Sequence, residues 1–367
     1  MNVCIAHGGD ISFPGGGTNR VLAFTKALAE NGYEVSLVVP KPKGKIPELP
    51  NVEIHTIPIG AKSIKDQILR ALFVSWKAKK LAEKEKAILQ VEHSTLGGIA
   101  ASLGCSNYIL DIHEVCFEDP IYSGIYVSRL VYWLERKAVK NALKVIVVSP
   151  PMRDYVIKEW KVPEEKVVMI PNGYFAEKLN NLNLGEVKDT EGLVSFLGVF
   201  THIIDYKKVI KLAESRKDIK ICMIGDGPMR SKFVEIIRRC RLNNIATPGF
   251  LPDNKAYKIL AESQVCIQPL LGGVTTKVDG HMKILNYAAL GKAIATDRDG
   301  ISTVFEKHSA ALVSDPANPF EFIENVHKLL DDENMRKKLG SKAKELAKDF
   351  TWEKQGKKLV KLYEKLT

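Results

Sequence analysis

The sequence predicts an α/β protein with two successive doubly wound domains, each built on a parallel sheet. Short β-branched runs alternate with amphipathic helical stretches along most of the chain. These runs are apolar throughout, which is typical of parallel strands that helices cover on both faces. The 367 residues exceed the usual size of a single hydrophobic core, so two domains are expected.

The first series of elements fills the N-terminal half of the chain. Its expected strands cover 2–6, 34–39, 52–57, 88–92, 108–112, 144–149 and 166–170. Helical patterns lie between most of them, including 19–30, 64–86 and 127–141. A polar stretch rich in Asn and Gly then breaks the rhythm, which is typical of a linker. We therefore expect an N-terminal domain at 1–178 and a linker at 179–192.

A second alternating series follows the linker and predicts a C-terminal domain at 193–350. Its expected strands cover 193–198, 219–225, 265–270, 292–297 and 310–315. The chain ends in three consecutive helical patterns, the last at 352–366 within a final segment at 351–367.

Composition and cysteine spacing narrow the class of protein. The chain is 45% hydrophobic and 26% charged, which is ordinary for a globular protein, and no apolar run reaches the length that spans a bilayer. Its start carries no basic segment before an apolar run, so no signal peptide is expected. The six dispersed cysteines include no Cys-x-x-Cys pair and several lie in strand-like runs. We expect buried thiols in a reducing cytosol, with neither a disulfide framework nor a zinc site.

The net charge of +11 indicates an anionic partner: nucleic acid, an anionic membrane or a phosphate-bearing substrate. A lysine-rich surface like that of heat-adapted proteins is an equally simple explanation. Nucleic acid is disfavoured because the basic residues are spread over both halves, without an aromatic-interleaved patch.

Loops that directly follow strands carry most of the unusual residues. Ligands of open parallel sheets bind beyond the carboxyl ends of the strands, so these loops are the candidate sites. Gly15–Gly17 follow the first strand, although they lack the spacing of a dinucleotide-binding G-x-G-x-x-G motif. His113 and Glu114 follow another strand, and "GDGP" (225–228) and "LLGGVTTKVDGHMK" (270–283) follow strands of the second half.

Six segments resemble, in the family's order, those of the retaining, nucleotide-sugar-dependent glycosyltransferases of the B fold (GT-B). The resemblance is to the glycosyl transferases of group 1 and family 4. The six segments are "FPGGGTNRVLAFTKALAENGYEVSLVVP", "VIVVSPPMRDYVIKEWKVPEEKVVMIPNGYF", "ICMIGDGPMRSKFVEII", "IATPGFLPDNKAYKILAESQVCIQPL", "KILNYAALGKAIATDRDGIS" and "DFTWEKQGKKLVKLYEKL". The resemblance implies two Rossmann-like domains facing across a cleft, with the C-terminal helix crossing back to the first domain. It implies an N-terminal acceptor domain and a C-terminal donor domain.

The resemblance also assigns roles to residues. His113 would contact the transferred sugar, and Lys283 would act with it as a catalytic residue. The donor diphosphate would lie against Gly15, Gly16, Gly17, Gly198, Gly273, Thr275, Thr276, Lys277, His281 and Met282. The nucleotide would contact Gly225, Gly227, Phe250, Leu251 and Asn286, although a plain strand-to-helix turn is the simpler explanation of "GDGP". Thr18 and Asn172 would lie on the acceptor side. From their own place in the sequence, Asp111 and Glu114 are expected to be structural partners or caps.

Two departures from the family pattern concern the donor site. Val199 and Phe200 stand where an arginine is expected, and Lys207 and Lys208 are expected to face solvent along a helix. Val278 (or Asp279, after a slip of one residue) and Asn286 replace a pair of glutamates, the second of which grips the ribose hydroxyls. These departures leave open a non-catalytic, degenerate partner subunit. A nucleotide-sugar epimerase on the same fold is a further alternative, although no additional acid/base carboxylates stand out in the sequence.

The segment 63–86 combines apolar residues at helical spacing with a basic face. The stretch from Lys62 to Lys86 contains eight basic residues and three acidic ones. The basic residues are Lys62, Lys65, Arg70, Lys77, Lys79, Lys80, Lys84 and Lys86, and the acidic residues are Asp66, Glu83 and Glu85. Such a helix is typical of attachment to an anionic membrane. The competing interpretation is an ordinary helix packed on the first sheet with a solvated lysine face.

The sequence thus predicts a glycosyltransferase that moves a sugar from a UDP- or GDP-linked donor, with retention, to a glycan, lipid-linked or small-molecule acceptor. The expected location is cytoplasmic, with the inner face of the cell membrane as a candidate surface through 63–86. No cofactor is expected, and no metal is implied because neither an Asp-x-Asp motif nor a His/Cys ligand set is visible.

Overall fold

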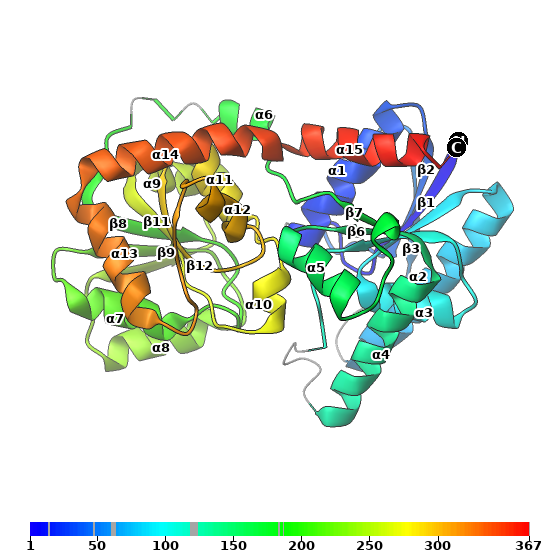
Figure 1. The fold of residues 1–367 in the computed structure, drawn as a ribbon, viewed down its shortest axis with the longest axis horizontal. Coiled ribbons are helices and arrows are strands. Elements are labelled where there is room, and N and C mark those ends of the chain that lie inside the picture. Colours follow the sequence, from blue (N-terminus) through cyan, green and yellow to red (C-terminus); the bar gives the residue numbers. More distant parts are fainter. Residues whose placement is uncertain are drawn as a thin grey trace. The chain divides into compact units, whose positions relative to one another are not determined.

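The computed structural model describes residues 1–13, 15–46, 48–59, 64–117, 124–182, 184–185 and 187–366. It divides into two compact units: Met1–Gly173, Val278–Gly280 and Trp352–Thr367 form unit 1, and Tyr174–Lys277 and His281–Thr351 form unit 2. Each unit contains a sheet whose strand pairs are all parallel, with helices packed against it (Figure 1). The prediction of two Rossmann-like α/β domains with parallel sheets is therefore confirmed.

The sheet of unit 1 has the strand order β3-β2-β1-β4-β5-β6-β7. Its strands are β1 (Asn2–Ala6), β2 (Glu34–Pro40), β3 (Val52–Ile57), β4 (Ile88–Glu92), β5 (Tyr108–Ile112), β6 (Ala142–Val147) and β7 (Val167–Met169). All of them lie where apolar runs predict strands, with small shifts such as that of β6. The order reverses between β1 and β4, and this switch point is where open parallel sheets form a crevice.

Helices of unit 1 connect these strands. They are α1 (Gly16–Glu30), α2 (Ile64–Glu85), α3 (Ser94–Ser102), α4 (Ile125–Asn141) and α5 (Pro150–Lys158), with the 3-10 turn η2 (Glu164–Lys166). The glycine-containing α3 was not foreseen, because "STLGGIAAS" lacks helical amphipathicity. Its glycines allow close packing: a side chain at Gly98 would collide with the backbone of Leu134 on α4.

The C-terminal helix α15 (Trp352–Glu364) belongs to unit 1, although it follows unit 2 in the chain. It packs along α1, with Trp352 edge-on to Phe24 at a ring-centroid distance of 5.9 Å. The buried Tyr363 hydroxyl donates a 2.7 Å hydrogen bond to Gln90 Oε1 on β4. The predicted return of the last helix to the first domain is thus present.

The sheet of unit 2 has the strand order β10-β9-β8-β11-β12-β13. Its strands are β8 (Thr190–Leu197), β9 (Lys220–Ile224), β10 (Ile245–Gly249), β11 (Ser263–Gln268), β12 (Ala293–Asp297) and β13 (Leu312–Ser314). The strand β10 was not predicted, since "IATPG" ends in a proline and a glycine. Proline is tolerated there because β10 is an edge strand. The switch point lies between β8 and β11.

Helices of unit 2 are α6 (Ala176–Asn180), α7 (Tyr206–Ser215), α8 (Arg230–Arg239), α9 (Asp253–Glu262), α10 (Val274–Val278), α11 (Lys283–Ala289), α12 (Ser302–Lys307), α13 (Pro319–Asp331) and α14 (Glu333–Ala347), with the 3-10 turn η3 (Lys348–Phe350). The division between the units falls after Gly173 rather than near 178. Helix α6 and the first residues of β8 occupy part of the segment expected as a linker. Residues 183 and 186 of that segment, like Lys62 and Ser63 before α2, lie outside the described residues.

The expectation that Lys208 faces solvent is wrong. Lys208 is 1% exposed, and its ammonium lies 2.7 Å from Oδ2 of the buried Asp297. It also donates to the carbonyl oxygens of Leu270 and Pro316. A buried carboxylate at a strand end needs a counter-charge and hydrogen bonds, and this requirement draws the lysine inward. Lys207 is exposed, as expected.

The six cysteines are free; five are buried and Cys240 is exposed. Among the residues that the structure describes, no helix combines the length and apolarity needed to cross a bilayer.

Candidate functional site

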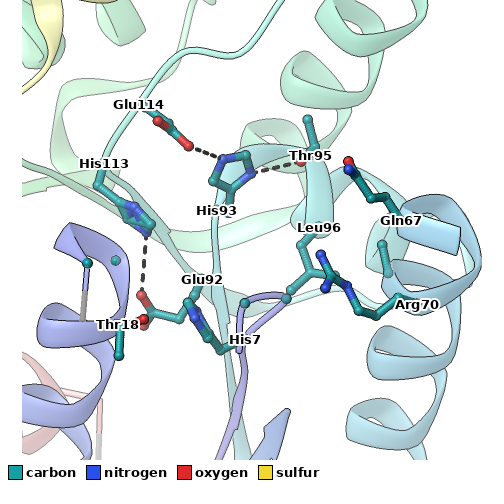
Figure 2. Close-up of a pocket in the computed structure, with 15 residues that line it drawn as sticks. His7, Thr18, Gln67, Arg70, Glu92, His93, Thr95, Leu96, His113 and Glu114 are labelled. Atoms are coloured by element: carbon teal, nitrogen blue, oxygen red, sulfur yellow. Dashed lines mark hydrogen bonds and ion pairs between the residues drawn. The ribbon is translucent and has the colours of Figure 1, made fainter. Parts of the chain in front are cut away.

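A pocket of about 350 Å³ opens in unit 1 at the switch point between β1 and β4. Loops after three strands, the first turn of α1, and helices α2 and α3 form its wall (Figure 2). The lining residues are His7, Gly8, Gly9, Gly15, Gly17, Thr18, Gln67, Arg70, Ala71, Glu92, His93, Thr95, Leu96, His113 and Glu114. The predicted residues Gly15, Gly17, Thr18 and His113 therefore meet at one site.

The glycine run forms the start of a helix rather than a separate loop. Helix α1 begins at Gly16, with Gly15 as its N-cap, whereas the sequence pattern predicts a helix only from residue 19. A Cβ added at Gly17 would lie 3.5 Å from Cε1 of His113 and 3.8 Å from Cε1 of His7. A bulkier side chain at Gly17 would therefore fill space between the two imidazoles, so the glycine keeps the helix end close to them.

Two imidazoles and a carboxyl group form the floor of the pocket. Nε2 of His113 lies 3.8 Å from Oε2 of Glu92, too far for a hydrogen bond. Among the residues that the structure describes, these two atoms and Nε2 of His7 are buried without a hydrogen-bond partner. Such groups favour a ligand that supplies donors and acceptors.

Burial sets the protonation of this floor. It lowers the pKa of His113 to about 4, with the charge of Arg20 acting in the same direction, and it lowers the pKa of His7 to about 3. Burial and the nearby Asp111 raise the pKa of Glu92 well above its usual value. Neutral imidazoles at pH 7 can each donate one hydrogen bond and accept another.

A buried ion pair holds the floor in place. The Arg20 guanidinium donates two hydrogen bonds to Asp111, of 2.7 and 2.8 Å, and both side chains are fully buried. Arg20 also donates to the carbonyl oxygens of Ile170 and Pro171. It thereby ties α1 to the ends of β5 and β7, and this agrees with the structural role expected for Asp111. Arg20 itself was missed, because its neighbours in sequence read only as an amphipathic helix.

Asn172 lies apart from the pocket lining. Its amide donates a 2.7 Å hydrogen bond to the carbonyl oxygen of Gly280, and its oxygen accepts one from Arg20. The side chain is buried and engaged on both ends. Asn172 therefore helps to hold Arg20 and the backbone at Gly280 in place, and it does not line the pocket.

In unit 2 the switch point brings Gly198 and Lys283 together. Gly198 follows β8, and a side chain there would collide with Cε of Lys283 at the start of α11. The Lys283 ammonium lies 5.7 Å from the centre of the Phe196 ring. Burial lowers the pKa of Lys283 to about 8, and Asp299 opposes this shift. The lysine is therefore mainly charged at pH 7 and can attract a diphosphate.

Asp299 organises the surroundings of that lysine. Its Oδ2 lies 2.8 Å from Nδ1 of His281 and accepts a 3.0 Å hydrogen bond from Gln268, while its Oδ1 accepts from the backbone amide of Ser302. His281 was predicted, but Asp299 and Gln268 were not. Their place after β12 and at the end of β11 is the signal that could have identified them.

The glycines of "GDGP" are required by the backbone. Gly225 and Gly227 have φ values of +130° and +152°, and side chains would collide with the backbones of Gly198 and Phe200 respectively. This agrees with the turn interpretation of the segment. Because these two glycines have no side chain, the turn can lie against the loop after β8, at Gly198 and Phe200.

The remaining predicted donor residues lie on loops and short helices of the second half. Gly273 and Lys277 are exposed, Thr275 is half-buried and Thr276 is buried, all in or next to α10. Met282 is the N-cap of α11, and Asn286 is half-buried on the same helix. Phe250 is 69% exposed and Leu251 half-buried, in the loop after β10. Gly16 lies in the first turn of α1.

Much of the pocket wall in unit 1 consists of residues that the sequence did not predict. His7, Glu92 and His93 come directly after β1 or at the end of β4, and Gln67 and Arg70 lie on α2. The sequence signal for the first three was their position at strand ends. No sequence signal placed α2 beside those strand ends.

Two family models together match nearly the whole chain. Residues 14–178 match "Glycosyltransferase Family 4", and residues 180–346 match "Glycosyl transferases group 1". Among curated proteins, an uncharacterised glycosyltransferase of Methanocaldococcus jannaschii is 26% identical over 63% of this chain, and the match covers 62% of that relative. The aligned part is therefore less than two thirds of that relative's length.

A second relative matches almost end to end. It is the N-acetylgalactosamine-N,N'-diacetylbacillosaminyl-diphospho-undecaprenol 4-alpha-N-acetylgalactosaminyltransferase of Campylobacter jejuni, 20% identical over 92% of this chain and 93% of its own length.

Solved structures share the fold. Sucrose-phosphate synthase of Thermosynechococcus elongatus superposes with a TM-score of 0.81 at 16% identity, covering 100% of this chain and 99% of its own. The Anabaena protein HepE in complex with UDP-glucose superposes with a TM-score of 0.73 at 13% identity, covering 100% of both chains. With its two Rossmann-like units and its two family matches, this chain belongs to the glycosyltransferases of the B fold, with a family 4 N-terminal part and a group 1 C-terminal part.

Proposed function

We propose that the protein is a retaining glycosyltransferase that moves a sugar from a nucleotide-sugar donor to a glycan or lipid-linked acceptor. The observation that carries the proposal is the floor of the pocket in unit 1. There His7, His113 and Glu92 each present a buried polar atom without a hydrogen-bond partner among the described residues. Sugar hydroxyls both donate and accept hydrogen bonds, so they suit two neutral imidazoles and a carboxyl group of raised pKa.

Unit 2 would hold the donor nucleotide. The Lys283 ammonium would neutralise charge on the diphosphate as the bond to the sugar breaks, and Gly198 would keep the space beside it clear. Transfer of this kind needs no metal at the diphosphate, because the lysine supplies the positive charge. The complex of HepE with UDP-glucose supports a uridine donor, and a guanosine donor is the second choice.

His113 would contact the transferred sugar. Its imidazole is neutral at pH 7, so its role is a hydrogen bond to a sugar hydroxyl rather than a charge on the anomeric carbon. Thr18, on the first turn of α1, would face the acceptor within the same pocket.

A second candidate function is that of a non-catalytic partner subunit. Two observations favour it: Val199 stands exposed where the family has an arginine, and Asn286 replaces a ribose-binding glutamate. An amide offers one acceptor oxygen, whereas a carboxylate can accept from both ribose hydroxyls.

We further propose that unit 1 rests on an anionic membrane from the cytoplasmic side, as a peripheral protein. Support comes from α2, where Ile68, Leu69, Leu72, Phe73 and Trp76 are exposed, and from α4, where Tyr126, Val127, Leu130 and Trp133 are exposed. Both helices carry basic residues as well: Arg70, Lys77, Lys79, Lys80 and Lys84 on α2, and Arg129, Arg136, Lys137 and Lys140 on α4. The combination of aromatic and basic side chains on exposed helices fits a lipid surface. The undecaprenol-linked name of the Campylobacter jejuni relative agrees with it.

Thermal unfolding in the presence of UDP, GDP, ADP and their sugars tests the donor proposal. A ligand that binds only the folded state raises the midpoint of unfolding. We expect one nucleotide family, UDP first, to raise it in the wild type and to lose this effect in Lys283→Ala. No shift with any nucleotide would favour the partner-subunit function.

A further inference from the structure

Three side chains with metal-binding atoms meet at one wall of the pocket in unit 1. Nε2 of His93 lies 2.8 Å from Oε1 of Glu114 and 3.1 Å from Sγ of Cys116. The ligand atoms of all three lie within 4.8 Å of one another. His93 follows β4, and Glu114 and Cys116 lie in the loop after β5, so the group joins neighbouring strand ends. Figure 2 shows His93 between Glu114 and Thr95.

A single ring nitrogen cannot serve both neighbours well. Nε2 of His93 carries either one proton or one lone pair. With a proton it can donate to Glu114, but then it cannot accept from the Cys116 thiol. With a lone pair it can accept from the thiol, but then it faces the acceptor-only carboxylate of Glu114. A divalent cation bound by the nitrogen, the carboxylate and a thiolate would satisfy all three.

The other ring nitrogen supports the metal-binding tautomer. Nδ1 of His93 lies 2.8 Å from the hydroxyl of Thr95. If Nδ1 donates its proton to that hydroxyl, the lone pair of Nε2 points toward Glu114 and Cys116. Ligand histidines are commonly oriented in this way by a partner on the second nitrogen.

A buried carboxylate fixes both ligand-bearing loops. Glu135 on α4 is fully buried, and its Oε1 accepts hydrogen bonds from the Ser94 hydroxyl (2.7 Å) and from the backbone amide of Cys116 (2.8 Å). Ser94 is the neighbour of His93. The same oxygen therefore holds the segment of His93 and the segment of Cys116 together. Metal ligands need this kind of support from neighbouring residues to keep their geometry.

The backbone at His93 adds an independent sign of constraint. Its φ is +91°, a conformation that is rare for residues other than glycine. Strain of this kind persists where the surroundings over-determine a functional side chain. Here it aims the ring at the loop after β5.

We propose that His93, Glu114 and Cys116 form a zinc site whose open coordination position faces the pocket. A nitrogen, an oxygen and a sulfur ligand suit Zn²⁺, and three protein ligands leave one position of a tetrahedron for another group. Tetrahedral zinc requires ligand–ligand separations of about 3.3–3.6 Å, so the distances from Nε2 of His93 to Glu114 (2.8 Å) and to Cys116 (3.1 Å) must each lengthen by about half an ångström. The exposed Glu114 can move away from His93, and a small rotation of the half-buried His93 ring would lengthen its distance to Cys116.

The proposal does not rest on glycosyl transfer, since it concerns metal binding by the chain alone. It differs from the sequence-based expectation of no metal, because the ligands come from two loops without a recognisable spacing. A hydroxyl oxygen of a pocket ligand could take the open position, so the metal would add a contact on the acceptor side.

A second group, Glu53, His55 and Glu85, also brings ligand atoms within 4.8 Å of one another. It includes no cysteine, and none of its three residues lines the pocket. Glu85 already accepts a hydrogen bond from Ser36. This second group therefore serves as an internal control.

Cobalt spectroscopy on the tag-free chain tests the site directly. Metal is removed with a chelator, Co²⁺ is added, and the near-ultraviolet charge-transfer band of a cobalt–thiolate bond is followed. We expect a band that saturates at a single equivalent of Co²⁺ and that Zn²⁺ abolishes. Cys116→Ser should remove the band, whereas Cys105→Ser, a change at a buried thiol of the same unit, and His55→Gln should retain it.

Glu114→Gln provides a variant whose fold is not at risk, because its side chain is exposed. Its affinity for Zn²⁺, measured by competition with a chromogenic chelator, should fall by at least about tenfold. No cobalt band in the wild type, or an equal band in Cys116→Ser, would overturn the proposal. Nucleotide binding is measured separately by thermal unfolding, so a failure of the zinc site and a failure of the transferase proposal remain distinguishable.

Discussion

Nε2 of His113 lies 3.8 Å from Oε2 of Glu92, and neither atom has a hydrogen-bond partner among the described residues. Because both groups are buried, the fold keeps the imidazole neutral and raises the pKa of the carboxyl group. The pair can therefore bind a polar, uncharged group, and the buried neutral imidazole makes the folded protein sensitive to acid.

We predict that acid destabilises the protein between about pH 6.5 and pH 4. The unfolded histidine takes up a proton near pH 6.5, whereas folded His113 does so only near pH 4 and folded His7 near pH 3. The unfolded state therefore binds more protons in this window, and the free energy of unfolding falls as the pH drops. Each histidine contributes a slope of at most about 1.4 kcal/mol per pH unit.

Urea unfolding at several pH values measures this effect. Glu92 acts in the opposite direction, because a carboxyl group protonated in the fold favours folding as the pH falls toward its unfolded pKa. The difference between wild type and His113→Asn isolates the histidine. The variant should show a shallower loss between pH 6.5 and 4, and the exposed His308→Asn should match the wild type. Equal slopes for His113→Asn and wild type would contradict the buried neutral imidazole.

We predict that Gly198→Ala lowers nucleoside diphosphate affinity at least about tenfold while the protein stays folded. The added methyl group would collide with Cε of Lys283 and displace its ammonium, and a charge-assisted hydrogen bond is worth about 1.5–3 kcal/mol. Gly272→Ala is the matched control, since a Cβ there would make only ordinary contact with Pro316 at 3.6 Å. Calorimetric titration with UDP compares the three proteins; unchanged binding in Gly198→Ala would remove Lys283 from the donor site.

The same lysine gives a pH dependence to donor binding. The pKa of Lys283 is lowered to about 8, so its charge is present below that pH and is lost above it. We expect UDP affinity to fall as the pH rises from 7 to 9. Lys283→Arg should abolish this fall, because a guanidinium stays charged throughout the range. A flat profile in the wild type would show that the ammonium does not contact the diphosphate.

The outcome at Asn286 separates the two candidate functions. In an active site that uses other groups for the ribose, Asn286→Glu should change UDP affinity little. In a degenerate site, wild-type binding should be weak and Asn286→Glu should tighten it by about ten- to hundredfold. Calorimetry on both proteins decides, and we expect the first result. Undetectable wild-type binding that Asn286→Glu restores would support the partner-subunit function.

Membrane attachment is tested on the apolar face of unit 1. Trp76 on α2 and Trp133 on α4 are each 52% exposed. The double change Trp76→Ser, Trp133→Ser should lower co-sedimentation with phosphatidylglycerol vesicles by about tenfold or more, because burying a large apolar side chain is worth about 1.5–3 kcal/mol. Phe320→Ser, at a residue of unit 2 that is 74% exposed, is the control and should sediment like the wild type. Equal sedimentation of all three would favour an ordinary packed helix.

The sequence predicted the fold well because parallel strands buried on both faces are visible as apolar runs. Its failures have physical causes. The edge strand β10 contains Pro248, and the lining helix α3 is rich in small residues, so neither shows the usual periodicity. Lys208 looked like a surface lysine because its partner, Asp297, is far away in sequence.

The candidate site was predicted only in part. His113, Gly17 and Thr18 could be found because they follow strands and match a family motif. His7, Glu92 and the group of His93, Glu114 and Cys116 could not, because their significance depends on which strand ends are neighbours. Strand order is a tertiary property that periodicity does not reveal.

The most direct test of the account is donor turnover followed by proton NMR, with the nucleotide sugar chosen by thermal unfolding. In the absence of acceptor, a retaining transferase releases its sugar slowly to water. We predict that the wild type releases nucleoside diphosphate and a sugar whose first-formed anomer is that of the donor. His113→Ala and Lys283→Ala should each reduce the rate about a hundredfold or more, as expected when a group that contacts the transition state is removed. Release of the opposite anomer, or equal rates in the wild type and both variants, would contradict the account.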